Sequence, residues 1–323
     1  MARVLNQIFG HNKTKEFILR SIERNRWPSC SMLVGPSGVG KSLLAKSIAQ
    51  ELLCDQLSEA CGACSTCLKI ENGENELLLH LTPEKGVLKI EEAQKIHNFL
   101  RLQNWGGKGR VIIIEDAHLL NTQAANSLLK RLEEPPQNTY FVLTAVSISA
   151  VMPTIKSRSQ IIPVSILNSQ DLKGVEGIEP WMLSSSMGRM DLLDQFREKE
   201  ISDLRGKFLD LLSKVLDEEP LNLAKSIQEL FDGKDDFILA CSWARQILRD
   251  AVYYKEGLSP LIHQDLIWIS EKFSVFNSYE LQWMFEYWQQ IEKDILSNLD
   301  RQLTLESFFI KANSKLKTGD LNL

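Results

Sequence analysis

The chain has 323 residues, of which 44% are hydrophobic and 24% charged, as is ordinary for a globular protein with a well-buried core. It has no run of about 18 apolar residues and no apolar signal stretch at its start, so we expect a cytoplasmic protein without a membrane partner. The formal net charge of −5 argues against a protein that coats nucleic acid by charge alone. Any contact with DNA would have to be local or shared with partner proteins.

A phosphate-binding loop is predicted near the start of the chain. Residues 8–24 predict a loop and an amphipathic helix, residues 32–34 an apolar strand and residues 43–53 a second helix. Between that strand and the second helix the chain reads Gly35-Pro36-Ser37-Gly38-Val39-Gly40-Lys41-Ser42. This segment fills the pattern G-x-x-x-x-G-K-[ST] at every fixed position, in the strand-to-helix context that the motif requires.

The residue types of this loop explain its expected chemistry. Glycines let backbone N–H groups and the helix N-terminus point at a polyphosphate. Lys41 would neutralise the β- and γ-phosphates, and the Ser42 hydroxyl would occupy a position on Mg²⁺. The sequence therefore predicts binding of ATP or ADP with Mg²⁺.

Four of the six cysteines crowd together after the second helix. They are Cys54, Cys61, Cys64 and Cys67. In a reducing compartment this spacing favours a metal over disulfides, because tetrahedral Zn²⁺ accepts four thiolates. Four cysteine ligands leave no open coordination position, so the insertion at 54–67 is predicted to hold structural rather than catalytic zinc. Redox-active or incidental thiols are the alternative.

Strands and helices alternate through the first half of the chain. Apolar runs at 77–81, 111–114, 140–144 and 161–162 predict strands, and amphipathic spacing at 91–102 and 121–134 predicts helices. From Leu167 onward the strand pattern is absent, and helices are predicted at 204–216, 221–231, 237–254 and 279–299, with a further helix beginning near residue 190. These patterns predict a doubly wound α/β nucleotide-binding domain with a parallel sheet, followed by helical domains.

Two carboxylates follow the 111–114 strand, at the strand end where parallel sheets place their chemistry. A phosphate-binding loop needs such a carboxylate to hold the Mg²⁺ shell or to orient a water. Glu115 and Asp116 supply two, in the reverse of the usual Asp-then-Glu order. Since about 1 Å of misplacement can cost about 10²-fold in rate, we expect ATP binding with weak or absent hydrolysis. An acidic strand end without a nucleotide role is the alternative.

Three more residues are candidates for contact with nucleotide. Thr144 ends a strand, where its hydroxyl could touch a γ-phosphate or the attacking water. Arg158 lies on a short segment from which it could enter the nucleotide site of an adjacent subunit and stabilise transition-state charge. An ordinary surface arginine is the alternative for that position. Arg189 could report the nucleotide state to the helical region.

Taken together, these residues resemble AAA+ clamp-loader subunits of bacterial DNA polymerase III, most closely the delta-prime branch and its gamma/tau relatives. The resemblance covers nearly the whole chain. Besides the phosphate-binding loop and the cysteine insertion it rests on Phe9-Gly10-His11, Pro83-Glu84-Lys85-Gly86, Glu115-Asp116-Ala117-His118-Leu119-Leu120, Ala124-Ala125-Asn126-Ser127-Leu128-Leu129-Lys130-Arg131-Leu132-Glu133-Glu134-Pro135-Pro136, Thr154-Ile155-Lys156-Ser157-Arg158-Ser159 and Asn298-Leu299-Asp300-Arg301-Gln302-Leu303-Thr304-Leu305-Glu306. Ser159 stands where the family usually has cysteine.

The resemblance implies a three-domain subunit, with an AAA+ core at 1–165, a small helical lid at 166–203 and a helical collar for oligomerisation at 204–323. It implies a pentameric ring with delta and gamma/tau that loads the β sliding clamp onto primer-template DNA. In that ring the chain would be a stator, and Arg158 would be the finger offered to a neighbouring gamma/tau ATP site.

A motor ATPase and a helicase are the alternatives to the stator function. An active gamma/tau-type motor ATPase is supported by the intact Lys41 and Ser42, whereas the reversed carboxylates and the end of the chain at Leu323 count against it. A helicase is suggested by the likeness of residues 115–118 to a DEAH box, but no further helicase motif is present.

Overall fold

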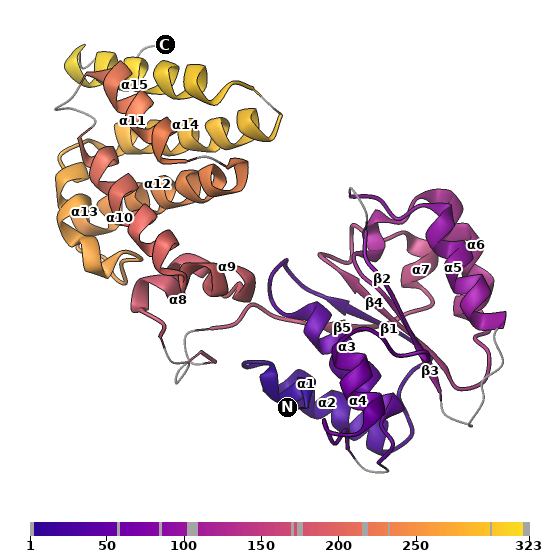
Figure 1. Cartoon of the computed structure of the whole chain (residues 1–323). Helices are drawn as coiled ribbons and strands as arrows, with labels where there is room; N and C mark the ends of the chain where they lie inside the picture. The colour runs from indigo at the N-terminus through magenta and orange to yellow at the C-terminus, as the bar shows by residue number, and fades with distance from the viewer. Residues whose placement is uncertain are drawn as a thin grey trace. The chain divides into compact units, whose positions relative to one another are not determined.

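The computed structural model describes residues 3–56, 59–83, 86–101, 109–168, 171–172, 177–214, 219–231, 233–297 and 299–318. The chain forms two compact units, Met1–Gly174 with Gly188–Asp191, and Val175–Met187 with Leu192–Leu323. Within the described residues the strands all belong to the first unit and the second is helical, which confirms the predicted fold class (Figure 1). The three-domain division with boundaries after 165 and 203 stays a prediction.

The first unit is a five-stranded parallel sheet in the order β2-β3-β4-β1-β5, with helices on both faces (Figure 1). Its strands are β1 (Cys30–Val34), β2 (Leu78–Leu81), β3 (Arg110–Ile114), β4 (Thr139–Ala145) and β5 (Gln160–Pro163). Its helices are α1 (Val4–Gln7), α2 (Asn12–Glu23), α3 (Lys41–Leu53), α4 (Ser65–Glu71), α5 (Ile90–Arg101), η1 (Ala117–Leu119), α6 (Thr122–Glu133) and α7 (Pro153–Lys156). Each strand predicted from the sequence is present.

Strand β3 shows why the sheet is buried on both faces. Ile112 and Ile114 pack into an apolar cluster with residues of α5 and α6, whereas Val111 and Ile113 pack into a second cluster with residues of α2 and α3. Successive side chains of a strand point to opposite faces, so a continuous run of β-branched residues suits a strand that is covered on both sides.

The parallel register brings the carboxyl ends of β1, β3 and β4 to one edge of the sheet. Val34 is level with Ala145, and Ile114 is level with Leu143. The segments that follow β1 and β3 therefore start beside the end of β4, which is where the candidate site is built.

The second unit consists of helices. They are α8 (Pro180–Ser186), α9 (Met190–Phe196, whose first two residues belong to the first unit), α10 (Lys199–Ser213), α11 (Pro220–Leu230), α12 (Lys234–Lys255), η2 (Gln264–Leu266), α13 (Ile267–Phe273), α14 (Ser278–Leu296) and α15 (Arg301–Thr318). The sequence analysis gave no range for α8, α13 or α15, and parts of its predicted segments, at residues 84–85, 102, 215–216 and 298, lie outside the described residues. No helix in the described part of the chain is long and apolar enough to cross a membrane.

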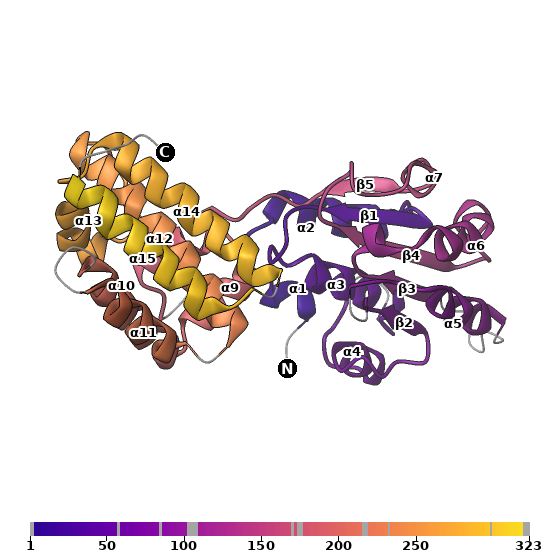
Figure 2. The same cartoon turned by 90° about the horizontal axis from the view of Figure 1, so that it is seen from above.

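Aromatic rings fill the core of the helical unit. The Phe208 ring centroid lies 5.5 Å from that of Phe231 and 5.9 Å from that of Trp288, both in edge-on geometry. Helices α14 and α15 lie side by side in both views, and the rings of Trp288 and Phe308 pack 5.1 Å apart between them (Figures 1 and 2). Trp288 of the helix predicted at 279–299 thus lies in the core, although Phe285 of the same helix remains 39% exposed.

A buried polar network joins α10 and α12 to the segment before α13. The Asp250 carboxylate accepts backbone N–H bonds from Ile262 at 3.0 Å and from His263 at 2.7 Å. Arg205 donates to His263 Nδ1 at 2.7 Å and pairs with Asp265 at 2.8 Å. Burial, aided by the charge of Arg205, lowers the pKa of His263 to about 3. The imidazole is therefore neutral in the folded protein near neutral pH.

This network predicts acid sensitivity. An unfolded histidine titrates near pH 6.5, so on acidification the unfolded chain takes up a proton before folded His263 does. The stability that neutral His263 contributes is complete above about pH 6.5 and is lost as pH falls toward about 3. We expect the free energy of unfolding, measured by urea denaturation, to fall by about 2 kcal/mol from this group between pH 7 and pH 5.

His263→Asn is the matched control, because its amide oxygen keeps an acceptor for Arg205 while the titration is removed. Its pH slope should be shallower than that of the unmodified chain. Equal slopes for the two proteins would contradict the assignment to His263.

Candidate functional site

The phosphate-binding loop lies between β1 and α3, as predicted. Gly38 and Gly40 have φ of +75° and +93°, a region that residues with a Cβ rarely adopt. The Lys41 ammonium donates to the carbonyl of Gly35 at 2.7 Å and to that of Pro36 at 2.6 Å. The loop therefore curls around the side chain at the start of α3, and only 7% of Lys41 is exposed.

Three carboxylates surround Lys41. Burial lowers the pKa of Lys41, and the charges of Asp116, Glu115 and Asp191 oppose that shift. Two of these carboxylates are the predicted ones after β3, whereas Asp191 is on the segment that returns from the second unit. A cation between carboxylates at the end of a parallel sheet is an arrangement that can hold a phosphate and a divalent metal together.

Glu115 lies between β2 and the phosphate-binding loop. Its Oε1 atom lies 2.8 Å from Nε2 of His80, and its carboxylate accepts a hydrogen bond from the Ser42 hydroxyl. Burial alone would raise the pKa of Glu115, but the hydrogen bonds from His80 and Ser42 outweigh burial and lower it. Glu115 is therefore ionised beside a hydroxyl, and such oxygens are the ligands that Mg²⁺ prefers.

Asp116 and Thr144 are joined through the backbone. Asp116 has φ of +47° and ψ of +53°, which is a strained left-handed conformation for a residue with a Cβ. Its N–H donates to the Thr144 hydroxyl oxygen at 2.9 Å. Thr144 thus fixes the turn that carries the Asp116 carboxylate, and its own hydroxyl hydrogen stays available to a further acceptor.

Residues Gly188–Asp191 pack against the phosphate-binding loop. The N–H of Met190 donates to the Gly38 carbonyl at 2.7 Å, and a Cβ on Gly38 would lie 1.9 Å from Oδ1 of Asp191. Arg189 is paired with Asp191, with Nη2 and Oδ2 2.7 Å apart. The structure therefore brings the predicted Arg189 to the loop, together with a carboxylate that the sequence analysis did not single out.

Arg158 has other neighbours. It follows α7 and forms an ion pair with Glu133 at the end of α6, and its Nη1 atom donates to the Thr154 carbonyl at 2.8 Å. The next residue, Ser159, has its hydroxyl 3.3 Å from the thiol of Cys30 on β1. The contacts of Arg158 among the described residues involve no part of the phosphate-binding loop.

The four cysteines meet between α3 and α4. Their Sγ atoms all lie within 4.8 Å of one another, with Cys54 Sγ 3.7 Å from Cys61 Sγ and 3.9 Å from Cys64 Sγ. Four sulfurs at about 2.3 Å around a tetrahedral Zn²⁺ are about 3.8 Å apart, so the cluster has the dimensions of such a site. These four close cysteines can bind a metal ion.

Backbone N–H groups are aimed at the sulfurs, which favours the thiolate form that a metal needs. Cys61 Sγ accepts from the N–H of Ala63 at 3.5 Å and from that of Cys64 at 3.3 Å. These hydrogen bonds lower the pKa of the Cys61 thiol to about 6. Burial raises the pKa of the Cys54 and Cys67 thiols, so it is the spacing of the four sulfurs, more than their pKa values, that fits a tetrahedral thiolate site.

Sequence reasoning missed two histidines at this site. His80 is the polar residue within the apolar run of β2. A polar residue in a buried strand beside a strand that ends in carboxylates could have identified it as a site residue. His11 is buried with Nε2 2.8 Å from the carbonyl of Val39, and burial lowers its pKa. His11 had no such local signal, because its contact with the loop spans 28 residues of sequence.

The chain is similar to known proteins. A family described as DNA polymerase III, delta subunit, matches residues 10–168. The chain is 27% identical over 304 residues to DNA polymerase III subunit delta′ of Pseudomonas aeruginosa, covering 87% of this chain and 90% of that protein. The chain is thus similar to DNA polymerase III delta-prime subunits over most of its length. The resemblance stated from the sequence is thereby confirmed.

Gamma-type proteins are similar over a shorter stretch. DNA polymerase III subunit gamma of Buchnera aphidicola is 32% identical over 143 residues, which cover 44% of this chain and 39% of that protein. A solved structure of a gamma subunit-related protein from Thermotoga maritima matches with a TM-score of 0.50 at 18% identity, over 93% of this chain and 98% of the other. This structural likeness shows that the two chains share a fold.

The contact between Thr144 and Asp116 predicts a measurable stability difference. Thr144→Val leaves the Asp116 N–H without its acceptor, and we expect a loss of about 1–3 kcal/mol in the free energy of unfolding by urea denaturation. Thr139→Val is the matched control on the same strand, because the Thr139 hydroxyl is buried and has no partner among the described residues. That change should be neutral or stabilising, and equal losses in both variants would contradict the role given to Thr144.

Proposed function

We propose that this delta-prime-type subunit is a stator of a clamp-loader ring that supplies Arg158 to the ATP site of a neighbouring gamma/tau subunit. The ring, which would also contain delta, would load the β sliding clamp onto primer-template DNA. The observation that carries this proposal is the placement of Arg158 away from its own phosphate-binding loop, in a surface ion pair with Glu133. An arginine so placed can act on a phosphate only in another subunit.

The pairing with Glu133 suits a residue that must exchange partners. The Arg158 side chain is 27% exposed and that of Glu133 is 48% exposed. An exposed ion pair of this kind contributes about 0–1 kcal/mol, so a more highly charged phosphate can displace the carboxylate. The guanidinium fork then binds phosphate oxygens in a way that lysine cannot reproduce.

The chain's own site is proposed to bind ATP or ADP with Mg²⁺ and to hydrolyse it weakly or not at all. Lys41 would contact the phosphates and Ser42 the metal, and the hydrogen bond between Ser42 and Glu115 supports this assignment. The shorter Asp116 is then left for orienting water, which supports binding more than turnover. Thr144 and Arg189 would contact the phosphate end of the nucleotide.

A gamma/tau-type motor ATPase is the second candidate. The complete phosphate-binding loop and the 32% identity to a gamma subunit favour it. The two candidates differ in which residue of this chain the assembly needs, since a motor depends on Lys41 and a stator depends on Arg158.

We also propose that Cys54, Cys61, Cys64 and Cys67 hold a structural Zn²⁺. When bound, the ion would cross-link the end of α3 to the start of α4. The sulfur spacing and the N–H groups directed at Cys61 support this assignment.

A reconstituted clamp loader separates the stator from the motor. With this chain in the complex, Arg158→Ala should slow DNA-dependent ATP hydrolysis and clamp loading at least about tenfold, because a trans arginine is worth about 10³–10⁵ at the site it serves. Lys41→Ala should change both rates by less than about twofold. Arg158→Lys keeps the charge without the fork and should resemble Arg158→Ala. The opposite ranking of Arg158 and Lys41 would favour the motor.

Metal analysis tests the zinc site. The reduced, freshly purified chain should contain one zinc per chain, and a chelator should lower the melting temperature by about 5 °C or more. Cys64→Ser should lose the metal, whereas Cys241→Ser, outside the cluster, should retain it. A metal-free protein whose melting temperature does not respond to added zinc or chelator would rule out the site.

A further inference from the structure

Helix α2 presents an aromatic ring and several cations at the surface of the first unit. Phe17 is 39% exposed even though its ring centroid lies 6.3 Å from that of the buried Trp27. Lys13, Arg20 and Arg24, the last at the C-cap of the helix, lie on the same side as Phe17, because successive positions in the series 13, 17, 20 and 24 are three or four residues apart. An exposed large aromatic side chain ringed by charge is typical of a binding surface rather than of a solvated helix.

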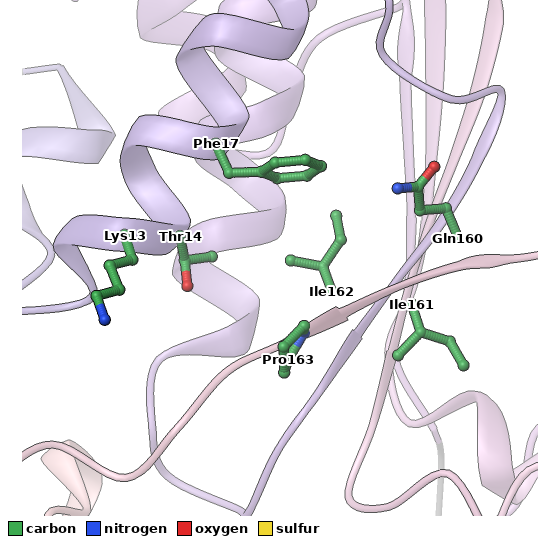
Figure 3. A pocket seen from close by; sticks show the side chains of 7 residues that line it. All are labelled: Lys13, Thr14, Phe17, Gln160, Ile161, Ile162 and Pro163. Atoms are coloured by element: carbon green, nitrogen blue, oxygen red, sulfur yellow. The ribbon is translucent and has the colours of Figure 1, made fainter.

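A hollow of about 290 Å³ lies on one side of Phe17, between α2 and the edge strand β5 (Figure 3). It is lined by Lys13, Thr14, Phe17, Gln160, Ile161, Ile162 and Pro163. Most of this lining is carbon, and the volume is at the lower end of ligand pockets. The hollow therefore suits one bulky apolar side chain better than a cofactor.

A second hollow of about 350 Å³ is also lined by Phe17. It is lined by Lys13, Glu16, Phe17, Arg20, Ser21, Arg24 and Arg26. Four cations face one carboxylate there, and that carboxylate, Glu16, is already paired with Arg20 at 2.6 Å. The local excess of positive charge stands out in a chain with a formal net charge of −5. Both hollows share Lys13 and Phe17 and are therefore adjacent, and together we call them the α2/β5 groove.

We propose that the α2/β5 groove docks an acidic peptide segment of a partner protein. A bulky apolar side chain of the peptide would enter the hollow beside β5 and pack against Phe17 and Ile162. Carboxylates next to it would pair with Arg20, Arg24 and Arg26. The buried apolar anchor would supply most of the binding affinity, and the charged flanks would fix the orientation of the peptide in the groove.

The edge strand itself indicates how the peptide is held. The N–H of Val164 donates to Val34 on β1, so the neighbouring Pro163 is turned away from β1, toward the free edge. Proline has no N–H, and a strand added at this edge would lack a donor at that position. Side-chain anchoring and charge, rather than continued β pairing, therefore carry the recognition.

The groove fits a peptide better than a nucleic acid. Its arginines, Arg20, Arg24 and Arg26, line only one of the two hollows, while the hollow beside β5 is mostly apolar. A nucleic acid strand repeats its charge along the whole path and needs cations along all of it.

Fluorescence anisotropy with the full chain tests this proposal. The probes are labelled peptides of about ten residues with Leu, Phe or Trp at the centre and Asp or Glu on both sides. Matched probes replace the central residue with Ala, and a single-stranded DNA of similar charge serves as the competing class. We expect saturable, salt-sensitive binding of at least one acidic peptide, weakened at least about tenfold when its centre is Ala.

Two variants of the chain locate the binding. Phe17→Ala and the double reversal Arg24→Glu/Arg26→Glu should each weaken the peptide at least about tenfold. Lys89→Glu/Lys130→Glu is the matched control, because it changes the net charge by the same amount. Lys89 precedes α5 and Lys130 lies on α6, both are exposed, and these helices cover the other face of the sheet. This variant should leave the affinity within about twofold. The Arg24/Arg26 variant keeps the test valid if Phe17→Ala unfolds, which a thermal melt will show.

The proposal is overturned if no acidic peptide binds up to about 1 mM, or if both double reversals weaken binding alike. It is also overturned if the DNA binds as tightly as the peptide and is equally sensitive to Phe17→Ala, since the groove would then be a nucleic-acid site. These outcomes do not depend on the role proposed for Arg158.

Discussion

The parallel pairing of β1, β3 and β4 is the constraint on which the candidate site depends. It sets Val34, Ile114 and Ala145 near one edge, so that the phosphate-binding loop, Glu115 and Thr144 meet without any long side chain having to reach across. The hydrogen bonds from Gly35 N–H to the Ala145 carbonyl and from Asp116 N–H to the Thr144 hydroxyl continue this pairing beyond the strands. The hydrogen bonds between the strands therefore determine where the site residues lie, and side-chain contacts then adjust their orientation.

Local patterns in the sequence were sufficient for much of this structure. The phosphate-binding loop has fixed residue types because its backbone requires glycine at Gly38 and Gly40 and a cation at Lys41. The strand at 111–114 was readable because burial on both faces demands an unbroken apolar run. The cysteine cluster was readable because its members lie within a span of sequence short enough to enclose one ion.

Other parts of the site depend on pairs that no local pattern records. Glu115 meets His80 from a neighbouring strand, Arg158 meets Glu133 from another helix, and Asp191 reaches Gly38 from far along the chain. Each of these contacts is decided by tertiary packing, so the sequence could nominate one member of a pair but not its partner. Helix α13 was missed for a related reason, since a seven-residue helix gives too short a window for periodicity to be distinguished from chance.

The contact between Ser159 and Cys30 bears on the behaviour of the protein under oxidising conditions. A cysteine at position 159 would place a second thiol beside Cys30, whereas here the buried Cys30 thiol faces the Ser159 hydroxyl at 3.3 Å. A hydroxyl cannot form a disulfide, so oxidation cannot tether the turn that carries Arg158 to β1 through these two positions. Burial also raises the pKa of Cys30 to about 11, which keeps its sulfur protonated and slow to react. The position of the turn that carries Arg158 is thus not expected to change through a disulfide at positions 30 and 159 when the surroundings become oxidising.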